Sequence, residues 1–284
     1  MSEDLPPRPL CAIEADLPDG YTPGTVTVCY LSGTDVSNKF MMSMLSMRDA
    51  DRLHWHRLDH GAWWINQRSG VNVARTRNSV VRKFLAQRDP APEWMLMVDA
   101  DMTFPPDALE RLLMTAEYSR TDPDIPDVNV IGGLCVGFGN KGDGTTDVKV
   151  ISTIFDPGDP KPGVPIPTFQ MAEPRDVKFK AVKQVYGTGA AFLLVHRQVL
   201  IDIAAGYGTL FPWFREEIIE DDREDVETND RNDYWISEDL FFCLQAQRCG
   251  YPVFVHAGVP IGHVKAIELN EDLWRYHATV VDMA

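Results

Sequence analysis

The chain has 284 residues, 44% of them hydrophobic and 24% charged, so it can bury a full globular core. Its formal charge of −15 argues against an enzyme that grips a nucleic-acid backbone, because phosphate contacts need clustered lysine and arginine. There is no run of about 18 apolar residues, and residues 1–20 are acidic and proline-rich, so we expect neither a membrane span nor a secretion signal.

The first half of the chain alternates predicted strands and helices. Residues 1–23 lack periodicity and are expected to form an N-terminal arm. A β-rich run predicts a strand over 25–32, and a helix is expected over 38–48. A second strand is expected at 62–65, and apolar spacing predicts a helix within 70–87. Such alternation indicates a mostly parallel sheet with helices on both faces.

Asp99 and Asp101 follow the apolar run from Met95 to Val98, which is typical of a strand buried on both faces. Alternate residues of a strand share a face, so both carboxylates are expected at one spot. A Pro-Pro turn and a helical pattern from Asp107 follow, which puts the acids at the ligand-binding edge of an α/β sheet. Hard divalent cations bind carboxylate oxygens, although a helix cap or a turn would also explain one acid.

The pattern changes beyond Asp127, where short β-rich runs and turns predict hairpins. The glycine-rich residues 137–144 lack the Gly-Lys-Ser/Thr of a phosphate loop, so we interpret them as a flexible turn. A strand is expected to enter a helix near Arg197. A last helix, with Ser237 as its N-cap, should lead to a strand at 251–258.

Two further compositional features bear on partners and location. Residues 216–233 hold ten acids against two arginines, which predicts a solvated loop or lid; a plain surface loop and a binding element for a basic acceptor both remain open. The five cysteines are scattered, without zinc or CxxC spacing, which favours reduced thiols and a cytoplasmic protein.

Several motifs occur in a suggestive order along the chain. They are "ARTRN" (74–78), "DAD" (99–101), "GTG" (187–189), "SED" (237–239) and "GHVK" (262–265). The order resembles the glycosyltransferase A fold, particularly the family-2-like enzymes that use nucleotide sugars, including small phage-encoded members. The likeness covers about Thr25 to Lys265.

The resemblance implies a Rossmann-like, mostly parallel sheet sandwiched by helices, with a C-terminal acceptor-side lobe. The glycosyltransferase domain would span 24–265, with a nucleotide-sugar half over about 24–135 and an acceptor half over about 136–265. Residues 266–284 would form a tail. For a phage-encoded member, the implied location is the host cytoplasm.

Carried over to this sequence, the resemblance implies that Asp101 ligates Mn²⁺ or Mg²⁺ at the diphosphate, with Asp99 near the ribose or the metal. His263 would complete the metal shell, although an ordinary packed or surface histidine is an alternative. A divalent cation neutralises charge that develops on a diphosphate leaving group. His256, inside an apolar strand, is interpreted as structural.

The same resemblance implies that Arg77 and Asn78 face the nucleotide, with Arg75 as a weaker candidate. A solvated helix face is the alternative for these residues. The first strand ends in "CYLSGTD" and lacks the proline and acid common in relatives. The base contacts are therefore open, with UDP-sugars favoured over GDP-sugars.

The remaining candidates lie on the sugar and acceptor side. Gly187, Thr188 and Gly189 match the approach to the donor sugar, since glycine lets backbone come close to a ligand, although a tight turn would also explain them. Glu238 and Asp239 match the acidic pair near the acceptor, with Asp239 at the position of the general base. An ordinary helix start also favours acids there.

Taken together, these motifs predict a metal-dependent glycosyltransferase that moves a sugar from a nucleoside diphosphate sugar to a hydroxyl acceptor, either a protein or a small soluble molecule. A sugar-nucleotide nucleotidyltransferase is an alternative, but the loop after the first strand, residues 31–40, has one glycine and one lysine, a poor match to its glycine-rich basic loop. A non-catalytic carbohydrate- or protein-binding module is the other alternative. Stable nucleic-acid binding is not expected.

Overall fold

The computed structural model describes ten stretches of the chain: residues 24–59, 63–70, 72–88, 91–121, 124–140, 148–160, 166–172, 181–208, 210–219 and 234–265. The predicted arm (1–23) and tail (266–284) lie outside these stretches, as do most of the acidic segment (220–233) and part of the glycine-rich turn (141–144).

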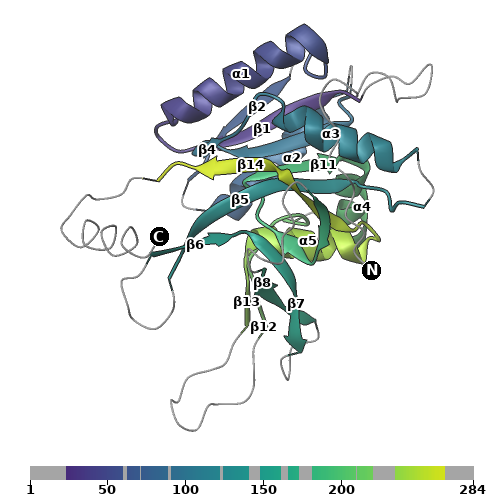
Figure 1. Cartoon of the computed structure of the whole chain (residues 1–284). Coiled ribbons are helices and arrows are strands. Elements are labelled where there is room, and N and C mark those ends of the chain that lie inside the picture. The colour runs from purple at the N-terminus through teal and green to yellow at the C-terminus, as the bar shows by residue number, and fades with distance from the viewer. Residues whose placement is uncertain are drawn as a thin grey trace, which may run out of the picture.

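A mixed β-sheet forms the centre of the protein (Figure 1). Its strands, in spatial order, are β2 (Trp64–Arg68), β1 (Val26–Ser32), β3 (Trp94–Asp99), β11 (Phe192–His196), β5 (Val130–Asn140), β14 (Val253–His263) and β4 (Met102–Thr103), with β6 (Val148–Ser152) beside β5 and β9 (Val182–Val185) beside β14. The pairs β1–β2, β1–β3 and β5–β14 are parallel, whereas β11 is antiparallel to both of its neighbours. From β2 to β14, β11 is therefore the strand that opposes the common direction within the described sheet.

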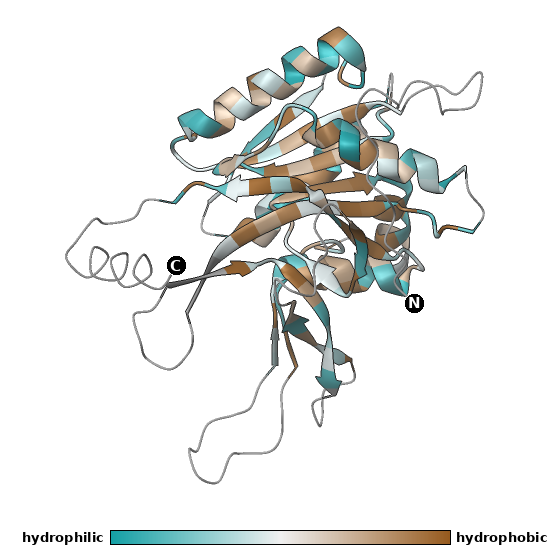
Figure 2. Ribbon diagram, in the orientation of Figure 1, coloured by the Kyte–Doolittle hydropathy of each residue, from teal (hydrophilic) through white to brown (hydrophobic). Residues whose placement is uncertain are grey.

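Helices cover both faces of this sheet. On one face lie α1 (Asn38–His54) and α3 (Ala108–Ser119), and on the other lie α2 (Val73–Ala86), α4 (Arg197–Tyr207) and α5 (Glu238–Arg248). Within β3, Leu96 and Val98 join the α1/α3 core, whereas Met95 and Met97 join the other core. All four are fully buried, which explains the unbroken apolar run of this strand (Figure 2).

Two small antiparallel sheets lie beside the main sheet, below it in the view of Figure 1. They comprise β10 (Gly187–Thr188), β7 (Ile154–Pro160) and β8 (Pro167–Met171), and the hairpin of β12 (Glu217–Ile219) and β13 (Tyr234–Ile236). Their residues pack with Leu240, Phe241 and Leu244 of α5 in a third apolar cluster. Hairpins were expected in this half, but β5 belongs to the main sheet because it also pairs with β14 and β11.

Four predicted elements have wrong boundaries. The last strand, expected at 251–258, is β14 and runs from Val253 to His263, so His263 ends this strand instead of following it. The first helix continues past residue 48 to His54, and the second strand begins at Trp64 rather than at residue 62. The strand β3 ends at Asp99, and Ala100 and Asp101 form a turn before β4. Asp99 and Asp101 are therefore brought together by a turn, not by strand alternation.

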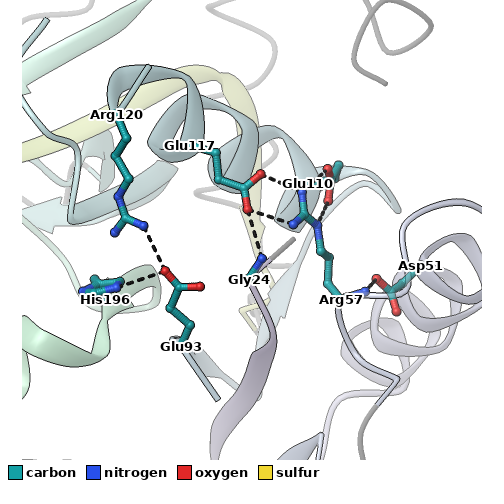
Figure 3. Close-up of polar contacts among 8 residues, drawn as sticks. All are labelled: Gly24, Asp51, Arg57, Glu93, Glu110, Glu117, Arg120 and His196. Carbon is teal, nitrogen blue, oxygen red and sulfur yellow. Dashed lines mark hydrogen bonds and ion pairs between the residues drawn. The ribbon is translucent and has the colours of Figure 1, made fainter. Parts of the chain in front are cut away.

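A buried ion-pair cluster fixes the segment after α1 against α3 (Figure 3). Arg57 donates to both carboxylate oxygens of Glu110 and of Glu117 at 2.8–3.0 Å. The carboxylate of Asp51 accepts the backbone N–H groups of Arg57 and Leu58. These contacts anchor the connection between α1 and β2 inside the protein.

Among the residues that the structure describes, no helix combines the length and apolar character needed to cross a bilayer.

Candidate functional site

A pocket of about 340 Å³ opens at the carboxyl ends of β1 and β3. Its polar lining residues are Ser32, Asp35, Ser37, Ser69, Asp99 and Asp101. Backbone bonds shape this edge, since Ala100 N donates to Leu31 O and Ser37 N donates to Ala100 O. The pocket thus lies at the ligand-binding edge of the parallel strands, and acids contribute much of its polar surface.

Asp101 contacts two basic residues from the far end of the chain. His263 Nε2 donates to Asp101 Oδ2 at 2.9 Å, and Lys265 Nζ donates to the same oxygen at 2.9 Å. The pairing of β14 with β4 places His263 opposite Met102, and Val264 N donates to Asp101 O at 2.8 Å. Backbone register therefore holds both basic residues at the turn after β3.

Arg77 joins the acids of two separate motifs. Its Nη2 donates to Asp99 Oδ2 at 3.1 Å, and its Nη1 donates to Glu238 Oε1 at 2.8 Å. The Arg77 side chain is 5% exposed, so its charge serves the two carboxylates rather than an open surface. Arg77, predicted to face the nucleotide, links α2 with β3 and α5 through these two contacts.

Asp239 lies beside this cluster at the first turn of α5. Its Oδ1 accepts hydrogen bonds from Ser237 Oγ and from Leu240 N. A Cβ built on Gly189 would lie 3.5 Å from its Oδ2, so the backbone of the "GTG" motif passes close to the carboxylate. The structure thus brings Asp239 and the "GTG" motif together.

The pKa values of Asp99 and Glu238 are shifted in the opposite direction from that of Asp101. Burial is the largest influence on Asp99 and raises its pKa, despite the neighbouring Arg77. Burial likewise raises the pKa of Glu238, despite Arg77. Burial would also raise the pKa of Asp101, but hydrogen bonds and charge from Lys265 and His263 outweigh it and lower the pKa. Asp101 is therefore held ionised more firmly than Asp99.

Asn78, predicted to face the nucleotide, makes buried contacts with the backbone. Its side chain is fully buried, and Nδ2 donates to Ala74 O at 2.7 Å and to Phe214 O at 2.6 Å. The Asn78 amide therefore fixes the segment around Phe214 against α2. Arg75, one turn earlier in α2, has an exposed side chain.

The "GTG" motif is tightly packed. A Cβ on Gly187 would lie 2.7 Å from Leu240 and 2.8 Å from Phe169, which no ordinary side chain tolerates. Thr188 is buried, and its backbone N–H donates a hydrogen bond to Cys243 Sγ. Its hydroxyl has no hydrogen-bond partner among the described residues. The packing of β10 on α5 therefore favours glycine at position 187.

The Asp101–His263 pair fits a divalent cation. When an octahedral ion lies about 2.1 Å from each ligand atom, two adjacent ligand atoms lie about 3 Å from each other. The Oδ2 and Nε2 atoms are 2.9 Å apart. The carboxylate suits Mn²⁺ or Mg²⁺, and the imidazole would add a nitrogen ligand once Nε2 gives up the proton that it donates to Asp101. No group of three or more potential ligand side chains forms a metal site within the described residues. The other ligands of such an ion would have to come from a bound molecule or water.

The sequence interpretation did not include Asp35 and Ser69, which line the pocket, or Lys265, which pairs with Asp101 beside it. Lys265 stands in the quoted "GHVK" motif, two residues after His263, and that spacing was the available signal. Asp35 and Ser69 lie in loops after β1 and β2, and no pattern distinguishes them from ordinary loop residues.

Comparison with known proteins supplies a fold but no sequence relative. No protein-family model matches the sequence, and no curated protein matches it. Among solved structures, the crystal structure of A197 from STIV has a TM-score of 0.50 and 13% identity, covering 85% of this chain and 86% of that chain. The shared topology extends over nearly the whole of both chains.

Two further solved structures are similar. A structure of GalNAc-T7 with UDP, GalNAc and Mn²⁺ has a TM-score of 0.49 and 10% identity, over 86% of this chain but 44% of that chain. A glycosyltransferase involved in glycosylation of the major capsid of PBCV-1 has a TM-score of 0.29 and 11% identity, over 62% of each chain.

The strand order and the likeness to A197 define the class of fold. The chain has an α/β fold that is similar to the glycosyltransferase A fold, with a mixed, mostly parallel central sheet and small additional sheets. The fold class predicted from the sequence is confirmed.

Proposed function

We propose that this protein is a metal-dependent glycosyltransferase that moves a sugar from a nucleoside diphosphate sugar, preferably a UDP-sugar, to a hydroxyl acceptor. One observation carries the proposal: the Asp101–His263 pair lies beside Asp99 at the mouth of a pocket at the carboxyl end of β3. This is where α/β sheets bind ligands, on a fold that glycosyltransferases use.

Within this proposal Asp101 and His263 would hold Mn²⁺ or Mg²⁺. The cation would neutralise charge on the diphosphate as the sugar departs. Asp99 would lie next to the ribose or the cation, with its orientation fixed by Arg77. Arg75, exposed at the start of α2, would offer its guanidinium to the nucleotide from the rim.

On the acceptor side, Asp239 would accept the proton of the attacking hydroxyl. Its Oδ1 is engaged by Ser237 and Leu240, which leaves Oδ2 facing Gly189. Glu238 would act through Arg77 rather than on the acceptor, since its Oε1 is committed to that guanidinium. The acceptor proposed is a protein or a small soluble molecule.

A ligand-induced shift in melting temperature tests this proposal. The protein is melted with UDP or GDP, each with Mn²⁺ or with EDTA, for the native chain and for Asp101→Asn. A ligand at 100 times its dissociation constant adds about 2.7 kcal/mol to stability. We expect stabilisation by a nucleoside diphosphate in Mn²⁺, and its loss in EDTA and in the variant.

The matched control is Asp49→Asn, which removes the same charge from an exposed position on α1. It should keep the full ligand shift. Stabilisation that persists unchanged in EDTA and in Asp101→Asn would contradict the metal assignment. The absence of any shift with either nucleotide would contradict the donor assignment.

A further inference from the structure

Lys265 and His263 donate to the same carboxylate oxygen of Asp101, each at 2.9 Å. An ionised carboxylate oxygen can accept both hydrogen bonds, but an ammonium group and a divalent cation compete for the same negative charge. The Lys265 side chain is 42% exposed and so has room to leave, whereas His263 is 21% exposed at the end of a paired strand.

The lysine is brought to this position by the backbone. The bond from Val264 N to Asp101 O, at 2.8 Å, fixes the chain one residue before Lys265. The ammonium therefore starts from a defined anchor, and its flexible stem sets how far it can swing. A lysine held this way stays near the pocket mouth after it releases Asp101.

The charges around the pocket give this lysine a distinct role. Asp35, Asp99 and Asp101 line the pocket, and the buried charge of Arg77 is shared between Asp99 and Glu238. Lys265 is thus the partly exposed cation that pairs with Asp101, whose side chain is itself 40% exposed. Its removal from Asp101 leaves one positive charge free beside the pocket.

Building on the proposed function, we infer that Lys265 is a displaceable cation: it occupies the charge of Asp101 while no divalent ion is bound, and it turns to the diphosphate once one is. Without a nucleotide, a divalent ion must break the lysine ion pair and remain near the freed ammonium. With a diphosphate present, the freed ammonium gains an anionic partner. Metal and diphosphate therefore bind cooperatively, and the coupling is reciprocal.

The experiment measures Mn²⁺ binding directly, from the free-ion resonance in electron paramagnetic spectra, with and without saturating UDP. UDP affinity in saturating Mn²⁺ is measured by calorimetry. Lys265→Met removes the charge and keeps most of the stem, and Lys265→Arg keeps the charge. Lys83→Met, on the far turn of α2, removes the same charge away from the pocket and serves as the control.

We expect Lys265→Met to bind Mn²⁺ alone roughly 5–20-fold more tightly than the native chain, as expected for an exposed charge near a divalent ion. We expect the same variant to bind UDP in Mn²⁺ roughly 5–20-fold more weakly, because the diphosphate loses a cation. These opposite signs distinguish a displaceable cation from a structural residue, whose loss would weaken both. Lys265→Arg and Lys83→Met should behave like the native chain.

The outcomes separate this inference from the proposed function. If the native chain binds neither Mn²⁺ nor UDP, both are overturned. If the native chain binds both, but Lys265→Met binds Mn²⁺ alone no more tightly, the inference is overturned and the proposed function stands. If Mn²⁺ binding tightens but UDP binding is unchanged, Lys265 competes with the metal and the diphosphate contact is refuted.

Discussion

The buried cluster of Arg57, Glu110 and Glu117 should be a major contributor to the stability of the fold. All three side chains are at most 3% exposed, and Arg57 forms a two-pronged contact with each carboxylate. Arg57→Met keeps most of the aliphatic volume and leaves both carboxylates buried without their cation. Removal of one partner from a buried ion pair costs about 3–5 kcal/mol.

The surroundings of Glu110 and Glu117 determine how much of the free energy of unfolding Arg57→Met should lose. Gly24 N donates to Glu117 at 3.3 Å and would continue to do so in the variant. Burial already raises the pKa of Glu110, and without Arg57 the pKa would rise further, until proton uptake limits the loss. We therefore expect a loss of about 4 kcal/mol at pH 7.

Urea unfolding, followed by tryptophan fluorescence at pH 7 and pH 5, measures this loss. A carboxyl group whose pKa is raised in the folded state makes the folded protein more stable as the pH falls. The stability difference between Arg57→Met and the native chain should therefore be smaller at pH 5. Arg111→Met, which breaks a partly exposed pair with Asp107, is the control and should cost about 1 kcal/mol or less. A loss below about 1 kcal/mol for Arg57→Met at pH 7 would refute the reasoning.

Three further predictions follow from the same geometry. Burial lowers the pKa of His256 to about 4. The contribution of the neutral side chain to folding stability is therefore complete above pH 6.5 and is lost as the pH falls toward 4. His256→Gln should flatten this part of the pH–stability curve, measured by urea unfolding, by up to about 3 kcal/mol. Arg77→Met should destabilise the fold by about 2–3 kcal/mol, because Asp99 and Glu238 lose a shared partner; an unchanged melting temperature with lost UDP affinity would instead indicate direct nucleotide contact. Asp239→Asn should bind UDP and Mn²⁺ normally but lower initial transfer rates by roughly 10²–10⁴-fold, and an equal loss of UDP affinity would count against its role as a base.

The central strands were predictable from the sequence because their apolar runs are governed by burial on both faces. Met95 to Val98 must fill two cores at once, and such a requirement leaves an unbroken apolar pattern. No comparable pattern in the sequence indicates that β11 lies antiparallel between β3 and β5. Strand order depends on long-range pairing, which local periodicity does not encode.

The candidate site was partly predictable for a similar reason. The position of Asp99 at a strand end follows from local pattern, but the contact of Asp101 with His263 requires the pairing of β14 with β4. The burial of Arg77 and Asn78 could not be predicted, because a polar helix face looks solvated until another segment covers it. Here the covering residues come from the segment around Phe214 and from the start of α5.

The late position of β14 in the chain has a consequence for biosynthesis. Asp101 and His263 are 162 positions apart, and at typical translation rates this separation corresponds to a delay on the order of 10–30 s. During that time a nascent chain exposes the acidic turn after β3 without the histidine and lysine that later pair with it. The contact between Asp101 and His263, and with it the proposed cation site, therefore forms only after β14 has been synthesised and has paired with β4.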